Sequence, residues 1–353
     1  MFTLQPNRDV PDERLSFYLQ AISEIYAVGS DTCIKNGYSI QRIYGGANNA
    51  LYKINAHDQQ FACKLCVDDV RQRAAREFGS LQALWAAGIK IAPRPLLLDE
   101  SKTTLPYPVV IYDWEEGTQL KPPVSPALLQ GFQATYHQLH NITPNDYPAF
   151  NLTAWFHWFD FNAYVDEIRD LGAPYMPWLP DSVPGGLKLK ERLDRILERC
   201  ADYVAKAEVD PGKGNFPLAL VRVDPNLANV IVGNENRIHW VDWEYSGWGD
   251  PALDIAELRW HAALQPLGKE ALQWLRTSYR PPHPDPGFEN RLRVWDRILA
   301  TRWPFLILRA LWSNYNGPDR QRLTQVEIPS RQYHQRIVEY LDRAEALFAG
   351  KDW

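Results

Sequence analysis

The chain changes its periodicity near residue 112. Before that point, short runs such as YSIQRIY, ALYKINA and QFACKLCV read as strands around one helical stretch. After it, apolar residues mostly recur at the spacing of helices. This change predicts an α+β protein with two lobes. We expect residues 1–112 to form an antiparallel sheet plus helix, 113–118 to connect the lobes, and 119–353 to be mainly helical with short hairpins.

Helix boundaries follow from caps and breakers. Asp69, with Gln72 three residues later, is the expected N-terminal cap of the early helix, and Gly88 is its expected end. The predicted helices are, approximately, 16–30, 69–87, 125–140, 155–170, 187–207, 252–263, 289–311 and 331–348. Proline-rich stretches at 172–185 and 280–287 predict surface loops.

Composition excludes several classes of protein. The 353 residues carry 38 Lys and Arg against 43 Asp and Glu, mixed along the chain, so the basic footprint of a nucleic-acid binder is missing. No apolar run approaches the roughly 20 residues that cross a bilayer, and the N-terminus does not read as a signal peptide. Four scattered cysteines are no disulfide framework. We therefore expect a cytoplasmic protein that binds neither membranes nor nucleic acid; the sequence does not predict its oligomeric state.

Lys64 stands in the middle of an otherwise apolar strand, which is unfavourable unless the ammonium is paired. Glu77, on the next helix, is the expected partner; an edge-strand or snorkelling lysine is the alternative. Ala62 shares the face of Lys64 and leaves room for a ring. Cys63 and Cys66 form a C-x-x-C pair, but an offset of three in a strand puts them on opposite faces, so they could not share a metal.

The turn between two strand-like runs contains Gly45, Gly46, Asn48 and Asn49. Glycines let a backbone approach phosphate oxygens closely, and the asparagines tolerate turn conformations and offer amide donors. An ordinary hairpin turn is the alternative interpretation.

The segment 221–258 has the most informative pattern. Asp224 follows an apolar strand, and Asn229 opens a hairpin whose midpoint we place between Glu235 and Asn236. That midpoint pairs Asn229 with Asp242, and such hard oxygen ligands suit Mg²⁺. Asp224 would then orient or deprotonate an incoming hydroxyl. Each residue alone could be a turn former or cap. Together with Lys64 and Glu77 they fit the needs of phosphoryl transfer.

From about residue 40 to 262, these segments resemble the aminoglycoside phosphotransferase and choline kinase superfamily, relatives of protein kinases. The resemblance implies a kinase-like two-lobed fold and an ATP- and Mg²⁺-dependent transfer of the γ-phosphate to a hydroxyl of a small molecule, such as an aminoglycoside, sugar or amino alcohol. It makes Asp224 the candidate base, and Asn229 and Asp242 the Mg²⁺ ligands. The implied ATP-binding residues are Gly45, Gly46, Asn48, Asn49, Ala62, Lys64, Glu77, and Ile111, Tyr112, Asp113 and Trp114 of the hinge. The candidates on the acceptor side are Glu244, Tyr245, Trp248 and Asp250; for Asp250 and for Asp254 a structural role is the alternative.

One departure from the family pattern concerns the residues before Asp224. Arg222 stands where the family usually has a bracing histidine, and Val223 stands in place of a glycine. Arginine can donate hydrogen bonds but differs from histidine in charge and shape. Two alternatives stay open: a choline or ethanolamine kinase, with Trp243, Tyr245 and Trp248 boxing a quaternary ammonium, and a non-catalytic nucleotide-binding pseudokinase.

Overall fold

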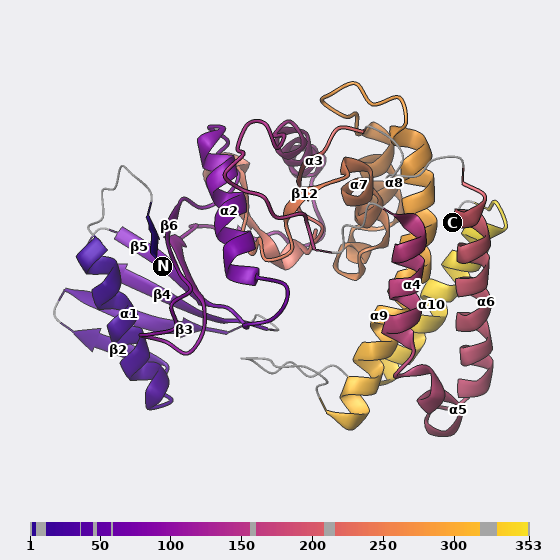
Figure 1. Cartoon of the computed structure of the whole chain (residues 1–353), viewed down its shortest axis with the longest axis horizontal. Coiled ribbons are helices and arrows are strands. Elements are labelled where there is room, and N and C mark those ends of the chain that lie inside the picture. The colour runs from indigo at the N-terminus through magenta and orange to yellow at the C-terminus, as the bar shows by residue number, and fades with distance from the viewer. Residues whose placement is uncertain are drawn as a thin grey trace.

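The structure is a computed structural model, shown in Figure 1. It describes residues 2–4, 12–35, 37–44, 48–57, 59–155, 160–207, 216–317 and 330–351. A large sheet with its helices stands at one end of the molecule, and most helices gather at the other (Figure 1). The predicted sheet-rich first part and mainly helical second part are thus confirmed, while the boundaries at 112 and 118 stay a prediction.

The N-terminal lobe is a seven-stranded antiparallel sheet with the order β1-β6-β7-β5-β4-β3-β2. Its strands are β1 (Phe2–Leu4), β2 (Thr32–Lys35), β3 (Tyr38–Ile43), β4 (Ala50–Ala56), β5 (Gln59–Leu65), β6 (Pro95–Asp99) and β7 (Val109–Asp113). Because β5 is a central strand covered on both faces, its run is almost continuously apolar. Lys64 therefore does not lie on an edge strand.

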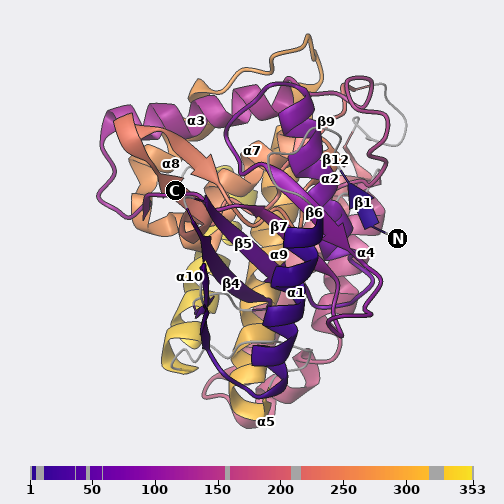
Figure 2. The ribbon, with the colours of Figure 1, turned by 90° about the vertical axis from the view of Figure 1, so that its left-hand side faces the viewer.

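Two helices cover opposite faces of this sheet, α1 (Asp12–Ala27) and α2 (Arg73–Ala86). Cys63 packs in the core under α1, whereas Ala62 and Cys66 pack in the core under α2. In Figure 2, α1 lies in front of the sheet, on the side away from the helical lobe. The two cysteines thus face different sides, as predicted.

The second lobe combines helices with two small sheets. Its helices are α3 (Pro126–His140), α4 (Phe161–Gly172), α5 (Leu179–Ser182), α6 (Gly186–Ala205), α7 (Pro251–Trp260), α8 (Lys269–Ser278), α9 (Phe288–Asn316) and α10 (Ser330–Phe348). Short 3₁₀ turns are η1 (Met176–Trp178), η2 (Leu227–Asn229), η3 (Asn234–Asn236) and η4 (Ala262–Leu267). One small sheet has the order β11-β10-β8, and the other pairs β12 with β9. Their bounds are β8 (Thr118–Gln119), β9 (Ala219–Val221), β10 (Val230–Val232), β11 (Ile238–Trp240) and β12 (Gly247–Gly249).

Some sequence predictions of local structure are wrong. Asp69 does not cap α2, because Gln72 precedes the helix in a left-handed conformation (φ 51°) and the Asp69 carboxylate instead accepts from Arg71 and Arg73. Gly88 does end the helix, in a left-handed conformation at φ 74°. The loop expected at 172–185 contains η1 and α5, and α8 was not predicted at all.

None of the helices in the described part of the chain combines the length and apolar character that crossing a membrane requires.

Candidate active site

A cavity of about 470 Å³ opens between the two lobes. The sheet lobe contributes Ala62 and Lys64 of β5, together with Asn48 and Asn49 just before β4. Across from them, Asn229 and Asp242 come from the two strand ends of the β10–β11 hairpin. Of the residues predicted for the site, Gly45 and Gly46 lie outside the described part of the chain.

Lys64 joins the two lobes inside this cavity. Its side chain is 6% exposed, and its ammonium donates to Glu77 at 2.6 Å and to Asp242 at 2.6 Å. The predicted pair with Glu77 is present. Burial alone would lower the pKa of Lys64, but Asp242 and Glu77 outweigh it and raise that pKa well above its usual value.

The Lys64 ammonium is the shared partner of two carboxylates, those of Glu77 and Asp242. Burial raises the pKa of Glu77 to about 7, although Lys64 counteracts the shift, and burial also raises the pKa of Asp242. Glu244 brings a third carboxylate into the cavity, but Arg73 donates to it. The group formed by Lys64, Glu77 and Asp242 is therefore short of positive charge.

Glu244, predicted on the acceptor side, lines the cavity and contacts Asn49. It is 2% exposed, and its carboxylate accepts from the Asn49 amide and from Arg73. The Asn49 carbonyl oxygen accepts from the Val67 backbone at 3.0 Å, so Asn49 ties the turn before β4 to both lobes. The backbone of Asp242, two residues before Glu244, is left-handed (φ 62°).

The side chains of the four predicted adenine-binding residues, Ile111 to Trp114, have different surroundings. Tyr112 and Trp114 line the cavity. Ile111 packs in the core under α1, and the Asp113 carboxylate accepts from Arg94 at 2.9 Å. Because the predicted contact with adenine is made by backbone groups, these side-chain directions do not decide it.

The loop after β9 carries Asp224. Asp254, 1% exposed, accepts from the backbone of Arg222 at 2.8 Å and of Val223 at 2.6 Å, and also contacts His140 at 3.0 Å. Val223 is left-handed (φ 67°), a conformation in which glycine is less strained. Asp254 thus has a structural role, the alternative that the sequence left open.

Asp224 itself has three neighbours at its carboxylate. Oδ1 accepts from the Asn226 backbone at 3.2 Å and lies 3.2 Å from Nε2 of His261, while Oδ2 has the Asn229 amide at 3.5 Å. Burial opposes its ionisation, but His261 and Arg222 prevail and lower the pKa of Asp224 below its usual value. Sequence reasoning missed His261, because no local pattern connects it to a residue 37 positions earlier.

The hairpin register differs from the prediction by one residue. Val230 pairs with Trp240 and Val232 with Ile238, so Asn229 stands opposite Val241, and not opposite Asp242. The turn is centred on Glu235, which, like Asn236, has a left-handed backbone. Asn229 and Asp242 nevertheless line the same cavity.

Arg222, the departure from the family pattern, holds the loop ends together. It is 1% exposed, and its guanidinium donates to the carbonyl of Asp224 at 2.8 Å, of Val241 at 2.7 Å and of Asp242 at 2.9 Å. It also stacks over Trp240 and Trp243, 4.3 and 4.8 Å from the ring centroids. One arginine therefore braces both loops that carry the candidate acidic residues.

The remaining acceptor-side candidates take other places. Trp248 is 4% exposed and donates to the Phe150 carbonyl at 2.7 Å. Asp250 caps α7 and accepts from Arg291 and Trp295, which gives it a structural role. Tyr245 contacts Arg71 through its hydroxyl at 3.1 Å. Among the described residues that line the cavity, none of these three appears.

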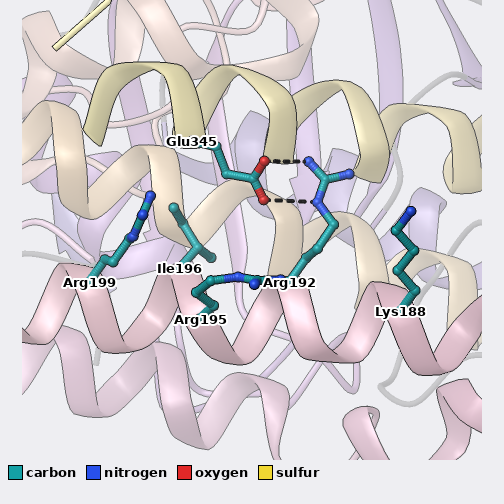
Figure 3. A pocket seen from close by; sticks show the side chains of 6 residues that line it. All are labelled: Lys188, Arg192, Arg195, Ile196, Arg199 and Glu345. Carbon is teal, nitrogen blue, oxygen red and sulfur yellow. Dashed lines mark hydrogen bonds and ion pairs between the residues drawn. The ribbon is translucent and has the colours of Figure 1, made fainter. Parts of the chain in front are cut away.

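A second hollow lies between α6 and α10, at the end of the molecule away from the seven-stranded sheet (Figure 1); Figure 3 shows its lining. Arg192 of α6 forms a bidentate pair with Glu345 of α10, and Lys188, Arg195 and Arg199 line the same hollow. Among the described residues that line it there is no amide and no carboxylate besides Glu345, so it lacks the parts of a phosphoryl-transfer site.

The sequence model of the APH phosphotransferase enzyme family matches residues 39–298, well over half of the chain. The chain belongs to this family. Two solved structures have the same architecture as this phosphotransferase. Spectinomycin phosphotransferase APH(9)-Ia, in complex with ADP and spectinomycin, has a TM-score of 0.60 at 15% identity, over 96% of this chain and 99% of that one. A thermostable mutant of aminoglycoside phosphotransferase APH(4)-Ia, in ternary complex with ADP and hygromycin B, has a TM-score of 0.55 at 13% identity, over 92% of this chain and 97% of that one.

Identities this low support the fold alone, and they confirm the predicted kinase-like two-lobed fold. No protein of curated function matches the sequence significantly.

Proposed function

We propose that this APH-family phosphotransferase uses ATP with Mg²⁺ and transfers the γ-phosphate to a hydroxyl group of a small molecule. The observation that carries the proposal is the contact of Lys64 from one lobe with Asp242 from the other, inside a cavity between them. Both solved relatives hold ADP together with a small antibiotic, which supports a nucleotide and a small acceptor here as well.

The nucleotide would bind against the sheet lobe. Ala62 leaves space beside the hinge residues Tyr112 and Trp114, and the cavity volume is within the range of about 300–1,000 Å³ usual for small-molecule sites. Lys64, held by Glu77, would contact phosphate oxygens in place of the Asp242 carboxylate. Asn48 lines the cavity just before β4 and would face the phosphates, while the amide of Asn49 is bonded to Glu244 and holds this segment in place.

The donor set fits a magnesium ion. Asn229 and Asp242 offer two hard oxygen ligands, and Mg²⁺ is usually held by one or two carboxylates with substrate phosphates and water. No cluster of three or more His, Cys, Asp or Glu side chains in the described part of the chain could hold a metal by itself. The shortage of positive charge around Lys64 favours a divalent cation. When bound, the ion would neutralise charge on the β- and γ-phosphates.

Asp224 would orient the acceptor hydroxyl and take its proton. The acceptor oxygen forms a bond to the γ-phosphorus, the bond from that phosphorus to the oxygen of ADP breaks, and the hydroxyl proton goes to the carboxylate. The lowered pKa of Asp224 keeps the carboxylate ionised at neutral pH, the form that can orient the hydroxyl, and also makes it a weak base, so positioning of the hydroxyl is its main contribution.

Neither alternative gains support. Trp243 and Trp248 are 1% and 4% exposed and pack in the main core, so they offer no aromatic box for choline. Arg222 braces the loops of Asp224 and Asp242 rather than disrupting them, which argues against a non-catalytic protein.

ADP release tests the proposal, measured over a panel of aminoglycosides, sugars and amino alcohols with and without Mg²⁺. We expect release above the acceptor-free rate with at least one compound, and only with Mg²⁺. Asp224→Asn should bind ATP as the wild type does but lower turnover at least about 100-fold, since it cannot accept the proton. Metal-independent turnover, or an Asp224→Asn variant as active as the wild type, would contradict the assignment.

A further inference from the structure

His261 directly follows α7, and its ring reaches back to the loop after β9. Its side chain is 15% exposed, and Nε2 lies 3.2 Å from Oδ1 of Asp224. Its backbone is fixed: the amide donates to the Glu257 carbonyl at 2.8 Å, and the carbonyl accepts from Gln265 at 3.0 Å. The main chain that carries the ring is therefore held in place by hydrogen bonds.

The hydrogen bonds of the ring define its tautomer. Nδ1 accepts from the Ala263 backbone amide at 3.3 Å, and because that amide can only donate, Nδ1 carries no proton. Nε2 faces the ionised carboxylate of Asp224, which can only accept. Nε2 is thus the ring nitrogen of His261 that donates to Asp224.

The orientation of the ring is also fixed. The ring of Trp303 meets that of His261 edge-on, with centroids 4.8 Å apart and planes at 84°. Trp303 in turn donates from Nε1 to the buried carboxylate of Glu257 at 3.1 Å. A ring held by packing and by hydrogen bonds can direct its donor at one oxygen.

This arrangement makes the two oxygens of Asp224 unequal. Oδ1 has two partners within 3.2 Å, the Asn226 amide and His261, whereas the Asn229 amide is 3.5 Å from Oδ2. We propose that His261 is a positioning residue that holds Asp224 through Oδ1, so that Oδ2 takes the proton of the acceptor hydroxyl. The inference rests on the proposed function and adds a residue from outside its predicted motifs.

Two substitutions separate positioning from packing. His261→Gln keeps an amide donor near the position of Nε2, while His261→Leu fills similar space without a donor. Removing a hydrogen bond to a charged group of this kind should lower kcat about 10- to 100-fold in His261→Leu, with KM for ATP within about twofold. His261→Gln should recover most of the activity. In an Asp224→Asn background, His261→Leu should have little further effect.

A second readout needs no turnover. In protein labelled with ¹⁵N-histidine, the His261 resonances are assigned by their disappearance in His261→Gln, and we expect the tautomer with the proton on Nε2. The Nδ1-protonated tautomer would overturn the inference, as would equal losses of kcat in the Gln and Leu variants or no loss in either. A wild type that neither binds ATP nor releases ADP would instead refute the proposed function, and this positioning role with it.

Discussion

Arg222 offers a demanding test, because the family pattern has histidine at its position. Methionine in place of Arg222 would be an unbranched side chain like the aliphatic part of arginine, but it has no donors for the carbonyls of Asp224, Val241 and Asp242. Each buried acceptor left unpaired costs about 1–3 kcal/mol, and the stacking over Trp240 and Trp243 is weakened as well.

These losses are partly offset, because a buried guanidinium is itself unfavourable and burial lowers the pKa of Arg222. We therefore expect Arg222→Met to lower the free energy of unfolding by about 3–5 kcal/mol, as breaking a buried charged contact usually does. Arg222→Lys, which can satisfy some of the three carbonyls, should lose about 1–2 kcal/mol.

Urea denaturation followed by circular dichroism measures these values, with turnover measured on the folded fraction. Arg192→Lys is the control: it disturbs the bidentate pair of Arg192 with Glu345 (Figure 3), which joins two helices at the end of the molecule away from the sheet (Figure 1). It should lose at most about 1 kcal/mol and keep its turnover. If Arg222→Met were as stable and active as the wild type, Arg222 would not be the brace of the two loops.

Three further predictions concern single residues. Asp242→Asn keeps an acceptor for Lys64, and asparagine tolerates the left-handed backbone. Because a neutral amide binds Mg²⁺ more weakly, the Mg²⁺ concentration for half-maximal activity should rise at least about tenfold. An unchanged Mg²⁺ dependence would count against Asp242 as a ligand. The pKa of Glu77 is raised from 4.5 to about 7 in the folded protein, so the folded state binds this proton more tightly than the unfolded state does. The stability gained from this proton is fully present below pH 4.5 and is lost as the pH rises to about 7. Relative to Glu77→Gln, the wild-type free energy of unfolding should fall by about 3 kcal/mol over that range, and parallel pH profiles would contradict the raised pKa. Gly247→Ala puts a methyl group 2.5 Å from the Ala154 backbone nitrogen, so thermal unfolding should show a free energy of unfolding lower by about 2–4 kcal/mol. Gly131→Ala is the control: its methyl group would lie 3.4 Å from Ile238, and alanine favours a helix, so this variant should be as stable as the wild type or more stable.

Much of the fold and the site could be predicted from the local spacing of apolar residues and from charged side chains in apolar segments. The alternation of short runs indicated the sheet, and an ammonium in an apolar strand required a partner, which Glu77 provides. Asp224 was chosen because it follows a strand, and Asn229 and Asp242 because a hairpin would pair them; Asn229 and Asp242 do line the cavity, and Asp224 lies next to Asn229.

Other features depend on the path of the chain in space. The hairpin register could not be counted from the sequence, because left-handed residues Glu235 and Asn236 set the turn. The contacts of Glu244 with Asn49 and Arg73 join residues more than 170 positions apart, so no local pattern could reveal them. His261 reaches Asp224 only through the direction in which α7 runs, which is a tertiary property.

The central claim is that Mg²⁺ and ATP bind where Lys64 meets Asn229 and Asp242. A crystal structure with Mg²⁺ and a non-hydrolysable ATP analogue tests it most directly. We predict phosphate oxygens on the Lys64 ammonium, the ion between Asn229 and Asp242, and Asp224 facing the terminal phosphate. A nucleotide bound elsewhere, with the contact between Lys64 and Asp242 intact, would contradict the account.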